Sequence, residues 1–192
     1  MTDPTVHAAN ALLRKHGIRF VVIGGQAVAR EAATATRDVD VMVTTADYRQ
    51  AIARLGKDDD LTLAIEGSAV TRFGIVALNG APLDLIDAGF FAGKKTGEEF
   101  FEFLLREAST EADGILYVSP EVVWYTRLMT KRWRAYAEKI VTNVVDGLSQ
   151  DLLAQVDAIA RRFGTEETIS ERIAYVREEL KRPDLDGLVR GD

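Results

Sequence analysis

The sequence predicts an α/β fold, a mixed sheet with flanking helices over the first 118 residues, followed by a helical part. In the first part, short β-rich apolar runs alternate with stretches of helical periodicity. Asn79-Gly80 separates two such runs, which is a strong signal for a β-hairpin. From Pro120 onward the periodicity is helical. We therefore expect an α/β domain over residues 1–118, a helical domain over 119–183 and a loosely ordered tail over 184–192.

The individual elements follow from local signals in chain order. Asp3 and Pro4 are typical of a helix start, and Gly17 of a helix end. Thr45 is a suitable N-cap and Gly56 a suitable C-terminal residue for a second helix. Helices are expected over residues 4–15, 26–31, 45–55, 96–107, 119–136, 138–163 and 165–181. Strands are expected over 20–23, 39–43, 72–78, 83–88 and 115–118, the last at an edge, and 61–65 is either a strand or a connection.

The composition is that of a soluble globular protein. Of the 192 residues, 47% are hydrophobic and 28% are charged, close to the average of soluble domains, and the absence of cysteine excludes disulfides and thiolate metal sites. No apolar run reaches the ~20 residues of a membrane span, and the N-terminal residues lack the pattern of a signal peptide. The net charge of −6 argues against a broad nucleic-acid-coating surface but leaves room for a local basic patch. We expect a cytoplasmic protein with no membrane association.

Two carboxylates on one face of a predicted strand are the first candidates for chemistry. Asp38 and Asp40 flank Val39, and residues two apart in a strand point to the same side. Two carboxylates crowded together repel each other and resist burial, and a divalent cation removes this repulsion. Carboxylate oxygens are preferred ligands of Mg²⁺, which commonly accompanies the phosphates of a substrate. The pair therefore predicts a magnesium site.

A glycine pair precedes these carboxylates. Gly24 and Gly25 end the apolar run 20–23, and glycine allows a phosphate to approach the backbone closely. A helix beginning near Gln26 would direct free N–H groups and its dipole toward an anion. The glycine pair therefore predicts a phosphate-binding turn.

The order strand, Gly-Gly, helix and strand with Asp-x-Asp resembles the signature of the polymerase-beta-like nucleotidyltransferase superfamily. Thr36 and Arg37 extend the likeness, because residues 36–40 read T-R-D-V-D, similar to the T-R-D-I/V-D segment of small bacterial members. Thr34 departs from it, since many relatives carry an arginine there. Within the superfamily the likeness is to stand-alone enzymes of the AbiEii type, many of them in toxin–antitoxin or abortive-infection systems. The resemblance implies the nucleotidyltransferase fold and a toxin–antitoxin partner.

The resemblance also implies a third carboxylate on a neighbouring strand, and Asp84 is the candidate. In the run 83–88, Asp84 shares a face with Ile86, and an aspartate among large apolar residues is costly unless a partner holds it. Asp87 lies on the opposite face, nearer the strand end. We interpret Asp87 as a loop or surface residue.

The helical part carries a basic cluster. One face of the predicted helices carries Arg127, Lys131, Arg134 and Glu138, three cations and one anion. The resemblance implies a lysine, followed by acidic residues, that meets the phosphates of the nucleotide. Lys139 is the first candidate and Lys131 the second, although Asn143 stands where relatives commonly have an aspartate. The alternative for this cluster is a solvated helix face with stabilising charge pairs.

Together these residues predict a two-metal transfer reaction. Asp38 and Asp40 would hold Mg²⁺ against a nucleoside triphosphate, while Asp84 would hold a second Mg²⁺ and help to deprotonate an attacking hydroxyl. The nucleoside monophosphate would pass to an RNA, protein or small-molecule acceptor. Two alternatives stay open, namely kinase-like transfer of the γ-phosphate at the same site, and a non-catalytic module that binds a partner.

Overall fold

The computed structural model describes residues 4–27, 38–55, 62–64, 73–78, 81–137 and 150–179. The chain forms two compact units, Met1–Ser119 and Pro120–Asp192. Several residues of the sequence analysis lie outside the described residues, namely Thr34, Thr36, Arg37, Asn79, Gly80, Lys139, Asn143 and the tail 184–192.

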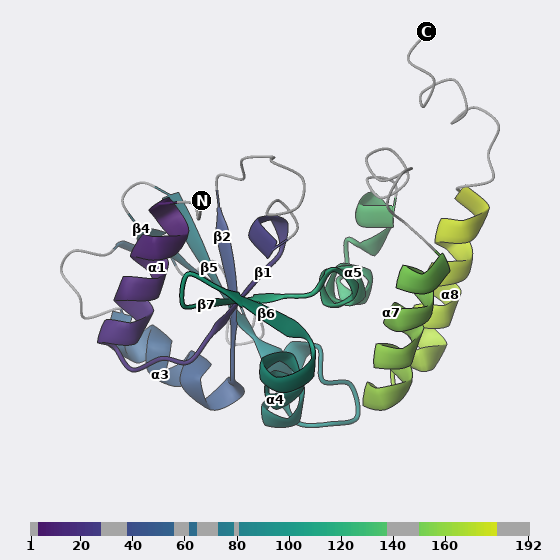
Figure 1. Ribbon diagram of the computed structural model, residues 1–192, viewed down its shortest axis with the longest axis horizontal. Helices are drawn as coiled ribbons and strands as arrows, with labels where there is room; N and C mark the ends of the chain where they lie inside the picture. The colour runs from purple at the N-terminus through teal and green to yellow at the C-terminus, as the bar shows by residue number, and fades with distance from the viewer. Residues whose placement is uncertain are drawn as a thin grey trace, which may run out of the picture. The chain divides into compact units, whose positions relative to one another are not determined.

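A mixed sheet forms the centre of the first unit (Figure 1). Over the described residues it has seven strands in the order β3-β4-β5-β2-β1-β7-β6. β2 pairs in parallel with β5, and β1 with β7, whereas the other neighbours are antiparallel. The strands are β1 (Val21–Ile23), β2 (Val39–Val43), β3 (Thr62–Ala64), β4 (Phe73–Leu78), β5 (Ala81–Asp87), β6 (Ser109–Ala112) and β7 (Ile115–Val118). The predicted hairpin is confirmed by the antiparallel pairing of β4 with β5.

Two helices of this unit, α1 (Pro4–Lys15) and α3 (Thr45–Leu55), cover one face of the sheet (Figure 1). Val6, Ala9 and Leu13 of α1 and Ala51 of α3 join a buried cluster with alternate residues of the central strands, namely Val22, Val39, Val41, Val43, Leu83, Leu85 and Tyr117. Because successive strand residues point to opposite faces, Asp40 and Asp84 project from the other face. The remaining helices of the unit are the short η1 (Ala88–Phe90) and α4 (Gly97–Glu107).

The N-cap of α3 is Thr44, one residue before the predicted cap. The Thr44 hydroxyl oxygen accepts a hydrogen bond from the backbone N–H of Asp47 at 2.9 Å. Thr45 is the first residue of the helix, and its hydroxyl donates to the Asp87 carboxylate at 2.7 Å. The prediction of Thr45 as the cap is therefore wrong by one position, because Thr45 is bound to a residue 42 positions away.

The prediction of residues 115–118 as an edge strand is also wrong. β7 lies between β1 and β6, and β6 is the strand at the edge. Its sequence, Ser-Thr-Glu-Ala, is polar and only partly buried, so hydrophobic alternation does not reveal it. Asp113 and Gly114 link β6 to β7 with φ values of 52° and 73°. An Asp-Gly turn with two positive φ values is typical of a two-residue hairpin, and this was the available signal.

The second unit contains α5 (Pro120–Met129), a helical segment at residues 133–137, α7 (Gln150–Phe163) and α8 (Glu166–Glu179). α7 and α8 lie side by side (Figure 1). Tyr125 is fully buried; its hydroxyl lies 3.2 Å from the Thr165 hydroxyl, and burial raises its pKa to about 12. In the part of the chain that the structure describes, no helix has the length and apolarity needed to cross a membrane.

The predicted helix over 119–136 is interrupted after Met129, which corrects the sequence interpretation. The Thr130 hydroxyl donates to the Arg127 carbonyl at 2.9 Å. The Arg172 guanidinium, from α8, donates to the carbonyls of Leu128 and Thr130. These side chains donate hydrogen bonds to carbonyls at the helix end, which the N–H groups of a further helical turn would otherwise bind. Arg127, Lys131 and Arg134 therefore do not share one continuous helical face.

Candidate functional site

Asp40 and Asp84 lie directly opposite each other on neighbouring strands. β2 and β5 run parallel, and their register pairs Asp40 with Asp84. Neighbouring strands are about 4.8 Å apart, so side chains from paired positions project from the same face in close proximity. Both residues are partly buried. Two of the three carboxylates of the sequence analysis are thus neighbours on the face opposite α1 and α3.

Asp38 is the third carboxylate of the sequence prediction, and its negative charge acts on Asp84. It is exposed and lies in a bend immediately before β2. Burial raises the pKa of Asp84, and the negative charge of Asp38 raises it further. The charge of Asp38 therefore acts on Asp84, as expected for carboxylates that share one side of the sheet.

Gly24 is in contact with the carboxylate of Asp40. It follows β1, where Ile23 pairs with Asp40, and it has a φ of 74°. A Cβ atom at position 24 would lie 2.0 Å from the Asp40 Oδ2 atom. Any side chain would therefore meet this carboxylate, in addition to the backbone strain at positive φ. The approach of a phosphate to Gly24 stays a prediction, and the structure adds a second role, because the glycine makes room for the Asp40 carboxylate.

Gly25 lies at the start of a helical segment. Residues 25–27 are helical, and Gln26 is buried with 8% of its surface exposed. The predicted helix start near Gln26 is confirmed by these residues. The remainder of the predicted helix, to residue 31, lies outside the described residues.

A metal ion was expected at the acidic group. Within the described ranges, no group of three or more His, Cys, Asp or Glu side chains is arranged so that it could hold a metal ion. The donor chemistry nevertheless fits Mg²⁺, because Asp38, Asp40 and Asp84 supply only carboxylate oxygens. Burial raises the pKa of Asp84 most, and a bound cation would offset the further rise that the charge of Asp38 causes.

Asp87 is a buried structural residue, so its interpretation as a loop or surface residue is wrong. Only 3% of its surface is exposed. Its Oδ1 atom accepts hydrogen bonds from the Thr45 hydroxyl and from the Gly89 N–H, both at 2.7 Å. Burial raises the pKa of Tyr48, and the charge of Asp87 raises it further. β5 extends to Asp87, so this carboxylate joins the α3 face instead of a loop.

The candidate lysines belong to the second unit. Lys131 is exposed in the turn after α5. Lys139, the first candidate for phosphate contact, lies outside the described residues. The structure therefore brings together Asp40, Asp84 and Gly24, and the charge of Asp38 acts on Asp84, whereas the roles of the lysines stay predictions.

Comparisons with known proteins find no matching family model and no matching curated protein. Solved structures do resemble the chain. The solution structure of the antibiotic-resistance factor ANT(2'')-Ia is 14% identical, with 90% of this chain and 89% of that chain covered, at a TM-score of 0.45. Its crystal structure with adenylyl-2''-tobramycin is 15% identical, with 91% and 95% covered, at 0.46. A protein from H. pylori named as a nucleotidyltransferase is 11% identical, with 95% of each chain covered, at 0.40. With every TM-score below 0.5, the function proposed for this chain rests on its own residues.

Proposed function

We propose that this chain is a Mg²⁺-dependent nucleotidyltransferase of the polymerase-beta-like superfamily. It moves a nucleoside monophosphate from a nucleoside triphosphate to a hydroxyl acceptor. The observation that carries the proposal is the register of β2 and β5, which sets Asp40 directly opposite Asp84. The T-R-D-V-D segment and the contact between Gly24 and Asp40 support it. Experiment must identify the acceptor as an RNA, a protein or a small molecule. Experiment must also test for a toxin–antitoxin partner and for a location in the cytoplasm.

The three aspartates would hold two Mg²⁺ ions. When bound, the ions neutralise the charge of the triphosphate and activate the attacking hydroxyl. Asp38, immediately before β2, and Asp40 of β2 would orient the triphosphate through the bound metal, and Asp84 lies opposite Asp40 on β5. The acceptor oxygen forms a bond to the α-phosphorus, the bond from that phosphorus to the β-phosphate oxygen breaks, and pyrophosphate leaves. In this proposal Asp84 accepts the hydroxyl proton from its position opposite Asp40.

The glycine pair and the lysines position the nucleotide in this proposal. Gly24 leaves space for the Asp40 carboxylate, and Gly25 exposes its backbone to the phosphates at the start of the following helical segment. Lys139 and Lys131 are the proposed phosphate contacts from the helical part.

The first test is stabilisation by nucleotide. Mg²⁺ with the correct nucleotide at about 100 times its Kd should add about 2.7 kcal/mol, which raises the Tm by roughly 5–10 °C in a protein of this size. Asp40→Asn should abolish this shift and leave the fold intact. Asp113→Asn is the matched control, because Asp113 lies in an exposed turn at positive φ, where asparagine is favourable. If nucleotide raised the Tm of Asp40→Asn as much as that of the wild type, Asp40 would not belong to the site.

The second test separates the transfer reactions. Incubation with nucleoside triphosphates labelled in the α- or γ-phosphate, together with RNA, protein and small-molecule pools, should give α-labelled products and pyrophosphate. Asp40→Asn and Asp84→Asn should each reduce this product by at least roughly 100-fold. Products labelled only from the γ-phosphate would identify a kinase-like reaction. Absence of both products, together with nucleotide binding, would identify a non-catalytic module.

A further inference from the structure

Positive charge is concentrated in the second unit at the turn after α5. The eight residues from Arg127 to Arg134 contain four cations, and no acidic residue occurs between positions 122 and 137. Lys131, Arg132 and Arg134 are exposed. The whole chain has a net charge of −6, so this concentration of positive charge is local to the turn. We call residues 127–136, together with Arg172 and Tyr175 of α8, the basic–aromatic turn.

Aromatic rings alternate with these cations. The Trp133 ring centroid lies 5.2 Å from the guanidinium carbon of Arg134 and 5.2 Å from that of Arg172. The ring of Tyr175 meets Trp133 edge-on, with the centroids 5.2 Å apart and an interplanar angle of 87°. Trp133 is only partly buried. The result is a partly open aromatic ring framed by guanidinium groups, each at cation–π distance.

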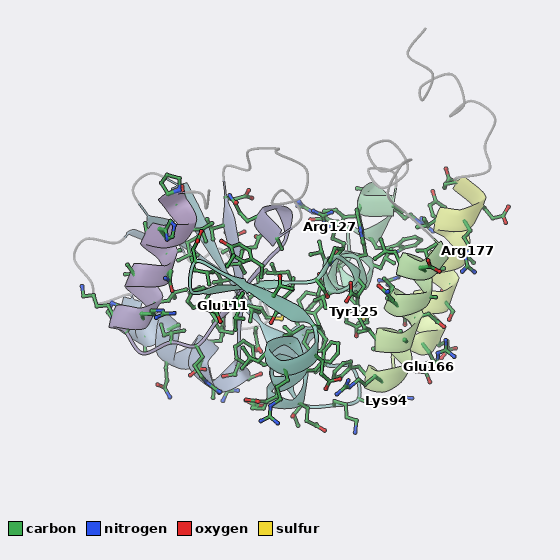
Figure 2. All side chains as sticks on the ribbon, in the orientation of Figure 1. Lys94, Glu111, Tyr125, Arg127, Glu166 and Arg177 are labelled. Carbon is green, nitrogen blue, oxygen red and sulfur yellow. The ribbon has the colours of Figure 1, made fainter. Side chains whose placement is uncertain are left out.

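The same arrangement recurs at Arg127, which is labelled on α5 in Figure 2. Its guanidinium carbon lies 4.7 Å from the ring centroid of Trp124 and 5.7 Å from that of Tyr136. Trp124 is buried with 5% of its surface exposed, whereas Tyr136 is partly exposed. Tyr136 therefore offers a second accessible ring, and Trp124 belongs to the core.

The two arginines beside Trp133 differ in how they are held. Arg172 donates to the carbonyls of Leu128 and Thr130, which ties it to the end of α5. Arg134 is exposed, and the contacts found for it within the described residues are with the Trp133 ring, without an ion pair. Because Arg134 is exposed, its guanidinium can leave this ring for another flat group, while Arg172 keeps Trp133 in place. Sequence reasoning could not find Arg172, because it is about 40 positions from the cluster.

We propose that the basic–aromatic turn binds single-stranded nucleic acid. Lys131, Arg132 and Arg134 contact phosphates, and an unpaired base stacks on Trp133. Single strands are favoured over duplexes because only unpaired bases offer a free face to an aromatic ring. An anionic membrane is disfavoured, because insertion needs exposed large apolar side chains, and Leu128 of this segment is buried with 1% of its surface exposed. This binding goes beyond the proposed catalysis, and Lys131, the second candidate for a contact to the nucleotide phosphates, is the one residue that the two proposals share.

The test measures binding of labelled 12-nucleotide RNA and DNA strands to the full chain carrying Asp40→Asn, without Mg²⁺. Trp133→Ala should weaken binding by roughly 10- to 100-fold, the range for loss of one stacked base. Lys131→Ala and Arg134→Ala should each lower the slope of log Kd against log salt by about 0.7. Lys94→Ala and Arg106→Ala, exposed cations of the first unit, are the matched controls and should leave binding unchanged.

Two further measurements keep the test decisive. Trp133→Phe retains packing against Tyr175, so a folded Trp133→Phe variant with an intermediate loss supports stacking even if Trp133→Ala does not fold. Strand binding should also quench tryptophan fluorescence, and a duplex of the same length should bind more weakly. Preference for RNA or for DNA identifies the natural strand. Equal binding of duplex, of heparin or of phosphatidylserine vesicles, or insensitivity to Trp133→Phe and Arg134→Ala, would overturn the proposal.

Discussion

The two faces of β2 and β5 carry carboxylates in opposite environments. On the face covered by α1 and α3, Asp87 is buried and accepts hydrogen bonds from Thr45 and Gly89. On the other face, Asp40 and Asp84 are partly buried beside each other, and a further negative charge from Asp38 raises the pKa of Asp84. One face provides hydrogen-bond donors for its buried carboxylate, whereas on the other face burial and a neighbouring negative charge raise the pKa of Asp84.

This difference separates a structural aspartate from a candidate ligand. A buried carboxylate that accepts hydrogen bonds from fixed donors stabilises the fold and has little capacity for a substrate. Carboxylates that repel each other destabilise the metal-free protein and gain from a cation. Asp84 and Asp87 are three residues apart on one strand, so strand geometry alone assigns them to the two faces.

The largest expected effect is on the face of α3. Asp87→Ala removes the acceptor from the Thr45 hydroxyl and the Gly89 N–H, and should lower the free energy of unfolding by about 3 kcal/mol. Asp87→Asn keeps one oxygen as an acceptor and should cost less. Chemical denaturation measures both variants. The control is Glu111→Ala, at an exposed residue labelled in Figure 2, which should change the free energy of unfolding by less than about 0.5 kcal/mol. A loss below about 1 kcal/mol for Asp87→Ala would contradict its structural role.

Gly24→Ala should give the next effect, on both stability and the proposed site. The residue has a φ of 74°, which costs a non-glycine residue roughly 1–2 kcal/mol, and its new Cβ would displace the Asp40 carboxylate. Nucleotide affinity should therefore fall together with stability. Gly114→Ala is the matched control, because its φ is 73° and a Cβ there would meet nothing within 4 Å. If Gly24→Ala and Gly114→Ala lost equal stability and Gly24→Ala kept its nucleotide affinity, the contact between Gly24 and Asp40 would be contradicted.

Asp84→Asn should give the smallest effect, with the opposite sign. Because the folded-state pKa of Asp84 is raised above its ordinary value of 3.8, the folded state binds more protons than the unfolded state between the two pKa values. Wild-type stability contributed by Asp84 is therefore complete below its ordinary pKa and is lost as pH rises through the folded-state pKa. In the absence of metal, Asp84→Asn should unfold at higher denaturant than the wild type at pH 7 and lose this advantage toward pH 3. A lower stability of Asp84→Asn at pH 7 would show that Asp84 is held by donors, as Asp87 is.

Local signals predicted most of the elements, because strand alternation and helix capping depend on neighbours in the chain. β2 and α3 have the predicted bounds, and Val39, Val41 and Val43 are buried, as alternation required. The failures occurred where a distant residue decided the outcome. The hydroxyl of Thr45 donates to Asp87, and Arg172 takes carbonyls at the end of α5. The polar edge strand β6 was missed because its two faces differ little in hydrophobicity.

The sequence by itself determined the α/β class, the side of the strand from which Asp40 projects, and the glycine pair before it, since these depend on the local backbone. Only the tertiary structure decided which strand lies beside β2. The parallel pairing with β5 sets Asp84 opposite Asp40, and the pairing with β1 brings Gly24 against the same carboxylate. Strand pairing is set by burial and hydrogen bonds across the whole sheet, and the periodicity of a single segment contains no information about its partner.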